Sequence, residues 1–327
     1  MIISRTPLRM SFAGGGSDIA SYYRDFGGAV ISTAINKYVY VNVNQKFDSG
    51  IRVGYSKNEE VLNVGAIEHQ IVKEALIYLG INGGIEITTI ADIPSRGTGL
   101  GSSSTFTVGL LHALNAFKGK YISSDQLAQD ACCIEIEKCN APIGKQDQYA
   151  AAYGGLNLIE FNPDDSVVVS PIICDAKTIK TIESTILVFY TGITRSASNL
   201  LLIQSKIMQS DMSKQAIMHK MVGLAHTLVE EIQNNNPNVF GEILHEGWML
   251  KKTILNEISN SEIDEWYQVA RNAGALGGRI LGAGAGGFLM LAAPPELHEY
   301  IKSKLNMLRH IPMSFDRMGS RIIFYEN

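Results

Sequence analysis

The pattern of hydrophobic and polar residues predicts mainly strands in the first part of the chain. Ala29 to Phe47 is rich in Val, Ile and Tyr and partly alternates between apolar and polar positions, which is typical of a strand. Ile67 to Leu79 has helical spacing and is followed by Gly80 and Asn82, which end helices. Ile85 to Ile90 then predicts a short strand. We therefore expect a sheet with one helix inserted before its last strand.

The middle of the chain predicts two helices and a return to strands. Thr105 to Phe117 places Phe, Val, Leu and Ala at helical intervals. A second helix is expected from Ser124, an N-cap residue type, to Cys139. Strand character returns at Leu156, and residues 163–165 (Pro-Asp-Asp) predict a turn. Ser184 to Tyr190 is a short apolar run, typical of a buried strand.

The last third of the chain is predicted to be mostly helical. Ala197 to Ser259 should hold two or three long helices, and Glu262 to Ala273 a shorter one. A glycine-dense hairpin with a strand from Phe288 to Ala293 follows, then a helix to Leu308 and a final strand at residues 321–325. Helices and strands thus occur in both halves, which predicts an α+β fold. A length of 327 residues favours two domains, which we place at residues 1–170 and 171–327.

Composition narrows the classes of function. Hydrophobic residues make up 46% and charged residues 18%, a globular balance, and the formal net charge of -4 disfavours nucleic acid as a partner. We expect no membrane association, because there is no apolar run of about 18 residues and no signal peptide. The four cysteines include no CxxC pair, which favours a reducing, cytoplasmic location. A homodimer is compatible with these features.

The strongest chemical signal is a glycine-rich loop between a predicted strand and a predicted helix. Alternating glycines allow the backbone to approach a ligand, and serines at the start of a helix add hydroxyl groups and free N–H groups. This arrangement suits a polyphosphate, but it is not a Walker A loop, because the G-K-[ST] ending is missing. A flexible turn with a serine cap is the alternative. The candidate ATP-binding residues are Pro94, Gly97, Gly99, Leu100, Gly101, Ser102, Ser103 and Ser104.

Two further glycine-rich loops are candidates for binding. Residues 282–287 match G-x-G-x-x-G, but a strand follows the loop where a dinucleotide-binding fold requires a helix. We therefore expect a close backbone approach there, either to ligand phosphates or to another loop. Residues 12–18 (FAGGGSD) place Asp18 beside three glycines, where it could accept hydrogen bonds from sugar hydroxyls. An ordinary hairpin turn with a surface salt bridge is the alternative.

Taken together, the three loops resemble the signature motifs of the galactokinase, homoserine kinase, mevalonate kinase and phosphomevalonate kinase (GHMP) superfamily. PSRGTGLGSSST is the most specific of them, and the resemblance covers essentially the whole chain. It implies an N-terminal domain of ribosomal-S5-domain-2-like fold, a C-terminal ferredoxin-like domain, and a site between them that uses ATP and Mg²⁺. TPLRMSFAGGGSD, PIGKQDQYAAAYGG and YTGITRSAS are most similar to the D-glycero-D-manno-heptose 7-phosphate kinase branch.

The resemblance also assigns catalytic roles. Asp147 matches the catalytic aspartate, as a base or as the group that orients the anomeric hydroxyl, and Arg9 matches the basic residue that faces it. Glu135 matches a glutamate that binds Mg²⁺ together with a serine of the glycine-rich loop. Ser103 is the first candidate for that serine, ahead of Ser104 and Ser102. Glu137 is a competing carboxylate, although on a helix it should point away from Glu135.

The expected substrate is a sugar or sugar phosphate that accepts phosphate on its anomeric hydroxyl. For the heptose branch the product would be the 1,7-bisphosphate, a precursor of nucleotide-activated heptose. A fucose-like or galactose-like sugar, a small alcohol, and a non-catalytic sensor of ATP and sugar are the alternatives. The candidate substrate-binding residues are Gly15, Gly16, Ser17, Asp18, Gly284 and Gly286, with Lys37, Lys145 and Arg195 as cations for a distal phosphate.

Overall fold

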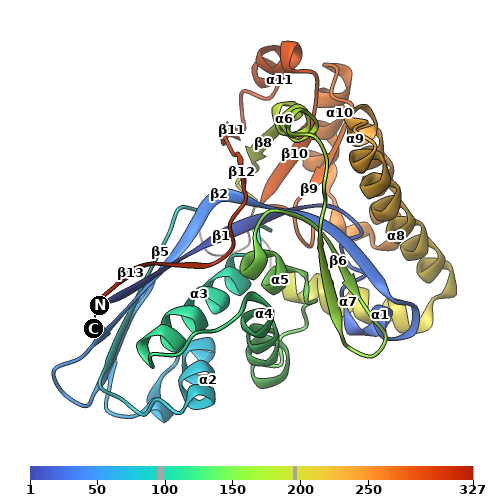
Figure 1. The fold of residues 1–327 in the computed structure, drawn as a ribbon. Coiled ribbons are helices and arrows are strands. Elements are labelled where there is room, and N and C mark those ends of the chain that lie inside the picture. Colours follow the sequence, from blue (N-terminus) through green and yellow to red (C-terminus); the bar gives the residue numbers. More distant parts are fainter. Residues whose placement is uncertain (94–98, 194–196, 327) are drawn as a thin grey trace.

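The N-terminal half forms a large sheet around two long antiparallel strands, β1 (Ile2–Ala13) and β2 (Gly28–Gln45), which cross the centre of Figure 1. The computed structural model describes residues 1–93, 99–193 and 197–326. Strand β2 pairs with β6 over its first residues and with β5 over its last ones. The other strands of this sheet are β3 (Ile51–Gly54), β4 (Asn58–Val61), β5 (Ile85–Ala91), β6 (Leu156–Phe161), β7 (Val167–Pro171), β12 (Phe315–Asp316) and β13 (Arg321–Tyr325).

The end of the chain returns to this N-terminal sheet. Strand β13 pairs with the start of β1, and β12 pairs with the middle of β2. The two termini consequently lie side by side in Figure 1. The division at residues 170 and 171 remains a prediction, but the topology adds that the last strands of the second segment belong to the first sheet.

One face of the large sheet is covered by four helices, of which α3 begins at the glycine-rich motif (Figure 1). They are α2 (Gln70–Leu79), α3 (Ser102–Phe117), α4 (Ser124–Cys132) and α5 (Gln146–Tyr153), and α4 continues as a π-helix over Cys133–Lys138. Helix α3 is the most buried of them because its apolar side chains occupy most of its surface. It packs against β1 and β2, which fixes its first turn relative to both strands.

The C-terminal half contains a smaller sheet flanked by helices. Its strands run in the order β11 (Arg309–His310), β8 (Ile186–Tyr190), β10 (Phe288–Ala292) and β9 (Gly277–Ile280). The helices of this half are α6 (Ala176–Thr185), α7 (Ala197–Ser210), α8 (Met212–Gln233), α9 (Phe240–Ile254), α10 (Ser261–Asn272) and α11 (His298–Lys304). A further short helix, α1 (Ala20–Phe26), follows β1 and contacts α7. The large sheet and the smaller sheet with its helices form a two-domain α+β architecture.

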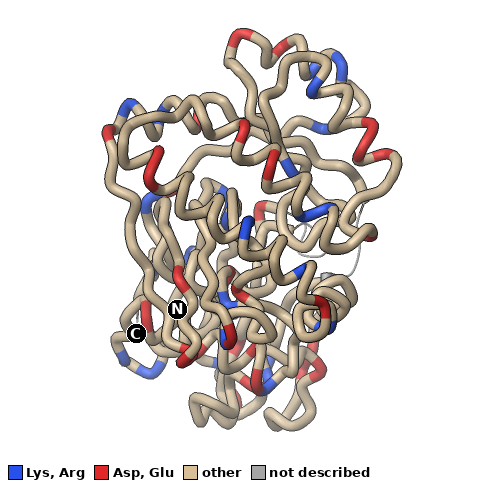
Figure 2. Tube along the Cα trace, turned by 90° about the vertical axis from the view of Figure 1, so that its right-hand side faces the viewer, with Lys and Arg blue, Asp and Glu red and all other residues tan. Residues whose placement is uncertain are grey.

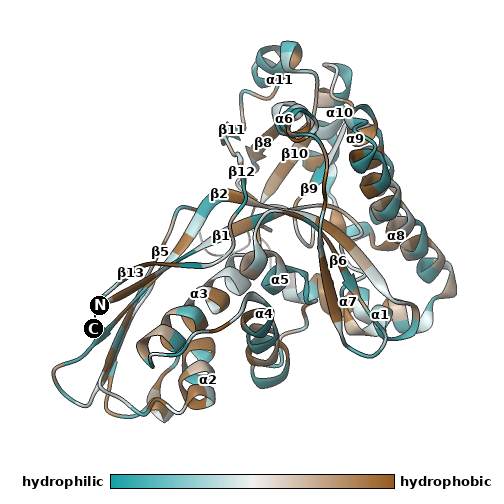
Figure 3. Cartoon of the chain, in the orientation of Figure 1, coloured by the Kyte–Doolittle hydropathy of each residue, from teal (hydrophilic) through white to brown (hydrophobic). Residues whose placement is uncertain are grey.

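The buried apolar side chains form two clusters, and the larger one is shared by both halves. The larger cluster of buried side chains runs from the N-terminal sheet into α8, α9, β8 and β10. Phe12 of β1 and Phe240 of α9 meet edge to face, with ring centroids 5.1 Å apart. In Figure 3, brown apolar residues are concentrated on strands such as β6, β8 and β10, and teal residues are common on the helices. Because apolar packing is continuous across the junction, residues of both halves are held in fixed positions where they meet.

Most predicted elements are confirmed, with shifts at their ends. Helix α3 begins three residues before the predicted Thr105, and the second helix is capped by Ser123, whose side chain accepts from Gln126 N–H, rather than by Ser124. The predicted strand from Ser184 begins two residues later, because α6 extends through Thr185. Helix α1 was not predicted. No helix of the described residues is long and apolar enough to cross a membrane. Acidic and basic residues are interspersed along the trace in Figure 2.

Gly154, at the end of α5, provides a test of how the returning C-terminal segment is held. Its φ of +69° and ψ of −178° form a combination open essentially to glycine alone. A Cβ there would lie 2.0 Å from the carbonyl carbon of Met318 and 2.1 Å from the nitrogen of Gly319. We predict that Gly154→Ala lowers the free energy of unfolding by roughly 3 kcal/mol or more, measured by denaturant titration.

Gly119→Ala is the matched control for this prediction. Gly119 also follows a helix with a positive φ, +67°, but a Cβ there would meet no atom within 4 Å. The backbone penalty alone should cost about 1 kcal/mol. Equal losses in the two variants would show that the close approach of residues 318 and 319 to α5 is not maintained in solution.

Candidate active site

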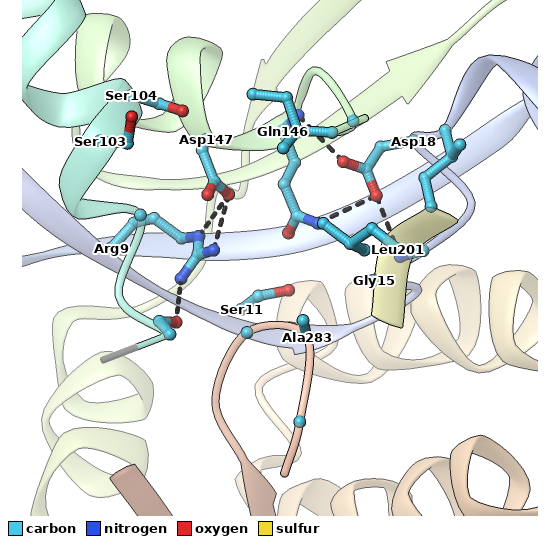
Figure 4. Close-up of a pocket in the computed structure, with 18 of the residues that line it drawn as sticks. Arg9, Ser11, Gly15, Asp18, Ser103, Ser104, Gln146, Asp147, Leu201 and Ala283 are labelled. Carbon is cyan, nitrogen blue, oxygen red and sulfur yellow. Dashed lines mark hydrogen bonds and ion pairs between the residues drawn. The ribbon is translucent and has the colours of Figure 1, made fainter. Parts of the chain in front are cut away.

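A cavity of about 270 Å³ lies where the two halves meet. Its walls come from β1 and the loop after it, the first turn of α3, the π-helix and the start of α5 on the N-terminal side. The C-terminal side contributes α7, α9, β9 and the loop between β9 and β10. Figure 4 shows part of this lining, with the Arg9–Asp147 pair on one side and Asp18 with Gln146 on the other.

The two predicted catalytic residues form an ion pair at the cavity wall. Arg9 Nε and Nη2 lie 2.7 and 2.6 Å from the same oxygen, Oδ1 of Asp147, and Arg9 Nη1 donates to the Gly99 carbonyl at 2.7 Å. The Arg9 side chain is 4% exposed and that of Asp147 23%. Within the described residues, Oδ2 of Asp147 accepts no hydrogen bond. Asp147 is therefore held by one oxygen, and the other is free to accept a proton.

The start of α3 faces the same cavity. Gly101 precedes the helix with a φ of +75°, and a Cβ there would lie 3.1 Å from Asp147 Oδ2. Ser102, Ser103 and Ser104 form the first turn and line the cavity. The N–H groups of a first helical turn have no partner within the helix, and the helix dipole makes this end positive. The structure thus brings the predicted phosphate-binding residues Gly99 and Gly101 to Ser104 against the Arg9–Asp147 pair.

Glu135 lies on the π-helix after α4 and contacts the serines in the first turn of α3. Its side chain accepts from Ser103 Oγ at 2.8 Å and from Gln148 Nε2 at 2.7 Å. Burial raises the pKa of Glu135, while these hydrogen bonds and one from Ser104 lower it. π-helical turns occur often at functional sites. The structure pairs Glu135 with Ser103, the first of the three serine candidates. Glu137 is instead exposed and contacts Cys133.

Asp18 connects the loop after β1 to the loop before α5. Its Oδ1 accepts from Gly16 N–H and from Gln146 Nε2, both at 2.9 Å, and its Oδ2 accepts from Gln146 N–H at 3.2 Å. Burial, and next the nearby charge of Asp147, raise the pKa of Asp18. Gly15, Gly16 and Asp18 all line the cavity, as predicted for substrate binding. Ser17 does not, because its hydroxyl is buried against the backbone of Ala29.

The loop at residues 282–287 makes close backbone contacts with other loops. A Cβ on Gly99 would lie 2.1 Å from the Leu281 carbonyl oxygen, so the two glycine-rich loops touch each other. Gly284 packs against Ile258 in the same way, and Gly286 against the carbonyl of Ile193. Of the two alternatives for this loop, the approach to another loop is therefore observed. Gly284 and Gly286 also line the cavity.

Several predicted residues lie elsewhere. Leu100 is fully buried, and only its carbonyl serves the site, as acceptor for Arg9 N–H. Lys145 is not among the described cavity-lining residues, because its ammonium group pairs with Asp165 at 3.1 Å and lies over the Tyr23 ring. Lys37 is not among them either. Pro94, Gly97 and Arg195 were also predicted and lie outside the described residues.

The cavity contains polar residues that the sequence did not reveal. Lys251 of α9 and Arg279 of β9 both face it although they are buried. Ser11, Gln146 and Gln204 add uncharged polar groups. No local motif marks these positions: Lys251 lies in a helix beside the half-buried Lys252, and Arg279 precedes the glycine loop inside a strand. Only the packing of the two halves brings them to the cavity.

These features define a small-molecule kinase, because a phosphate-binding helix start faces a carboxylate and an arginine across one small cavity. Residues 65–155 match the GHMP kinases N terminal domain, and residues 228–306 match the GHMP kinases C terminal domain. A D-glycero-alpha-D-manno-heptose 7-phosphate kinase of Campylobacter jejuni is 30% identical over 309 residues, which cover 90% of both chains. The chain belongs to the GHMP kinases, and ATP is the phosphate donor of this family.

Two other similar proteins extend the comparison. A crystal structure described as a D-glycero-D-manno-heptose 1-phosphate kinase from Bacteroides thetaiotaomicron superposes with a TM-score of 0.83 and 26% identity, covering all of both chains. A bifunctional fucokinase/GDP-fucose pyrophosphorylase of Arabidopsis thaliana is 26% identical over 91% of this chain and 30% of that protein. The two-domain GHMP kinase fold is thereby confirmed.

Gly144 provides a test of the loop that positions Asp147. A Cβ at Gly144 would lie 1.9 Å from Asp18 Oδ2, so an alanine there must displace the loop that leads into Asp147. Because a shift of about 1 Å at a reacting group can cost roughly 10²-fold in rate, we predict a fall of that order in kcat for Gly144→Ala.

The measurement is steady-state ADP release, together with the melting temperature. Gly223→Ala, on α8 and with open space at its Cβ, is the control and should keep full turnover. Full activity of Gly144→Ala would contradict the tight contact between Asp18 and this loop.

Proposed function

We propose that this protein transfers the γ-phosphate of ATP to the anomeric hydroxyl of D-glycero-D-manno-heptose 7-phosphate, giving the 1,7-bisphosphate and ADP. The substrate is suggested by the 30% identical relative from Campylobacter jejuni, which is named for this sugar phosphate. The similar crystal structure described as a D-glycero-D-manno-heptose 1-phosphate kinase supports the same class of sugar. The proposal therefore has two levels: the protein is a sugar kinase and, more specifically, a kinase of heptose 7-phosphate.

The observation that supports transfer is the free oxygen of Asp147 beside the start of α3. Arg9 occupies Oδ1 of Asp147, and Oδ2 lies close to Gly101, directly before the serine turn. A hydroxyl group placed between Asp147 and the serine turn can give its proton to Oδ2. The bond from the hydroxyl oxygen to the γ-phosphorus then forms as the bond from that phosphorus to the bridging oxygen of ADP breaks.

Arg9 has two roles in this proposal. Its ion pair holds Asp147 by Oδ1 and so fixes the carboxylate in the cavity wall. The same guanidinium bonds the Gly99 carbonyl and so stands next to the phosphate loop, where it can stabilise negative charge on the transferred group. The retention of Arg9, Ser103, Glu135 and Asp147 in one cavity favours a catalytic protein over a sensor that binds ATP and sugar without transfer.

Ser103 and Glu135 fit a Mg²⁺ ion. Mg²⁺ takes hard oxygen ligands, usually one or two from the protein and the rest from water and phosphate. The pair offers one carboxylate and one hydroxyl already in contact at 2.8 Å, and the described residues hold no cluster of three or more acidic, His or Cys side chains. A Mg²⁺ ion bound there would neutralise charge on the phosphates of ATP.

Substrate specificity tests the proposal. With Mg²⁺ and ATP, we expect ADP release with heptose 7-phosphate and much less with fucose, galactose or mevalonate. The product should carry the new phosphate at the anomeric carbon, as phosphorus NMR will show. Asp147→Asn should lower kcat by roughly 10²- to 10⁴-fold, because the amide cannot accept the proton. If only fucose is turned over, fucose takes the place of heptose 7-phosphate as the proposed substrate. If no compound is turned over, the result favours the alternative of a non-catalytic sensor of ATP and sugar.

Metal dependence tests the Ser103–Glu135 pair. Glu135→Gln and Ser103→Ala should raise the Mg²⁺ concentration for half-maximal activity by at least roughly tenfold, because each removes a metal ligand. Glu137→Gln is the matched control, two residues further on the same π-helix and exposed. It should behave as wild type. A change in Mg²⁺ requirement with Glu137→Gln, and none with Glu135→Gln, would transfer the metal role to the competing carboxylate.

A further inference from the structure

Two buried cations of the C-terminal half face the cavity without a negative partner. Lys251 is 4% exposed and donates from Nζ to the Gly282 carbonyl at 2.7 Å. Arg279 is 2% exposed and donates from Nη1 to the Phe12 carbonyl at 3.0 Å. In the parts of the chain that the structure describes, neither of them has a carboxylate within 4 Å. Buried charges are normally paired, because removing them from water costs far more than one neutral hydrogen bond returns.

The surroundings oppose the charge of both side chains. Burial lowers the pKa of Lys251 well below its ordinary value, and the nearby Arg279 lowers it further, whereas Asp18 acts in the opposite direction. Burial, and next the charge of Arg9, lower the pKa of Arg279 to about 10. Asp18 contacts neither cation among the described residues, because Gly16 and Gln146 donate to its carboxylate. An anion entering the cavity would supply the missing partner.

Arg279 lies at a defined part of the wall, beside Gly15. A Cβ on Gly15 would be 3.7 Å from Arg279 Nη2 and 3.4 Å from Ser11 Oγ. Among the described residues, neither the buried Ser11 hydroxyl nor the buried Nε of Arg279 has a hydrogen-bond partner. Unsatisfied buried donors are rare and costly, so the unpartnered Nε of Arg279 and the unpartnered Ser11 hydroxyl, both on cavity-lining residues next to Gly15, point to a ligand.

This part of the wall is on the side of Asp18 rather than the side of the serine turn. In Figure 4, Gly15 lies beneath Asp18 and Gln146, and Ser103 and Ser104 lie beyond Asp147 on the opposite side. The phosphates of ATP are expected at the start of α3. An anion at Gly15 therefore belongs to the other substrate, and a planar guanidinium with a hydroxyl beside it suits a phosphate.

We infer that Arg279, supported by Lys251 and the Ser11 hydroxyl, binds the phosphate that the acceptor sugar already carries. This inference rests on the proposed function for the identity of the sugar, but the subsite itself requires only a phosphorylated acceptor. It replaces the assignment of the distal phosphate to Lys37 and Lys145. Lys145 is already neutralised by Asp165, and neither lysine is among the described lining residues.

Kinetics of Arg279→Met and Arg279→Lys test the inference. We expect Arg279→Met to raise the KM for the sugar phosphate roughly 10- to 100-fold, because a charged hydrogen-bonding partner is lost. The KM for ATP should stay within about threefold, and Arg279→Lys should recover part of the loss. A larger effect on the KM for ATP than on that for the sugar phosphate would overturn the inference and assign Arg279 to the donor.

Lys251→Met and Lys252→Met form the matched pair. The two lysines are adjacent on α9, but Lys252 pairs with Asp264 at the surface. We expect only Lys251→Met to raise the KM for the sugar phosphate. Because both Lys251 and Arg279 are buried, binding of a non-hydrolysable ATP analogue and the melting temperature will confirm that each variant is folded. Equal KM values for the two lysine variants would remove Lys251 from the subsite.

A binding experiment separates this inference from the proposed function. Calorimetry with inorganic phosphate, in the presence of a saturating non-hydrolysable ATP analogue, measures the subsite without turnover. Binding by wild type that Arg279→Met weakens at least tenfold supports the subsite, even if no heptose is phosphorylated. If heptose 7-phosphate is turned over but Arg279→Met binds and uses it as well as wild type does, the kinase proposal stands and the subsite is wrong.

Discussion

The ion pair between Arg9 and Asp147 is the interaction on which the cavity depends. One side chain on β1 reaches the start of α5 through Asp147 and the glycine-rich loop through the Gly99 carbonyl. The backbone N–H of Arg9 bonds the Leu100 carbonyl as well. Because the guanidinium is almost fully buried, these contacts act in a medium of low dielectric constant, where a charged hydrogen bond is strong and its loss is costly. The glycine-rich loop and Asp147 are thus fixed relative to each other by contacts within the protein.

The second constraint is the absence of side chains at particular glycines. Gly101 leaves room for Asp147, Gly144 for Asp18, and Gly99 for the backbone at residues 281 and 282. In each case a Cβ would overlap or crowd an atom of another segment, so the close approach is possible with glycine alone. The glycines therefore bring protein segments together around the ligand space. In this structure, their first role is to let the segments that form the cavity walls pack closely. Leaving the backbone accessible to a ligand is their second role.

The sequence predicted those parts of the site that are encoded locally. Gly99 to Ser104 could be recognised because glycines followed by serines before a helix have a direct meaning for backbone geometry. Asp147, Arg9 and Glu135 came from the resemblance to a family, since an isolated charged residue carries no signal of its own. Lys145 was predicted as a cation for a distal phosphate, but its ammonium group pairs with Asp165, twenty residues away in sequence, and no sequence pattern marks that contact. Lys251 and Arg279 could not be found, because their place is set only by the packing of α9 and β9 against the N-terminal half.

The fold shows the same limit. Hydrophobic periodicity located α2, α3 and β2 to within a few residues, because these elements bury one continuous face. It could not predict that β13 pairs with β1 across the whole length of the chain, since strand pairing leaves no mark in either strand. The packing of the smaller sheet against β1 is equally invisible in the sequence: Arg9 and Arg279 lie 270 positions apart, yet the charge of Arg9 lowers the pKa of Arg279. Of the three buried cations, Asp147 neutralises Arg9 alone, while Glu135 and Asp18 are satisfied by uncharged donors. The three carboxylates balance the three cations in number, but Lys251 and Arg279 contact none of them among the described residues, so that wall of the cavity favours an anionic ligand.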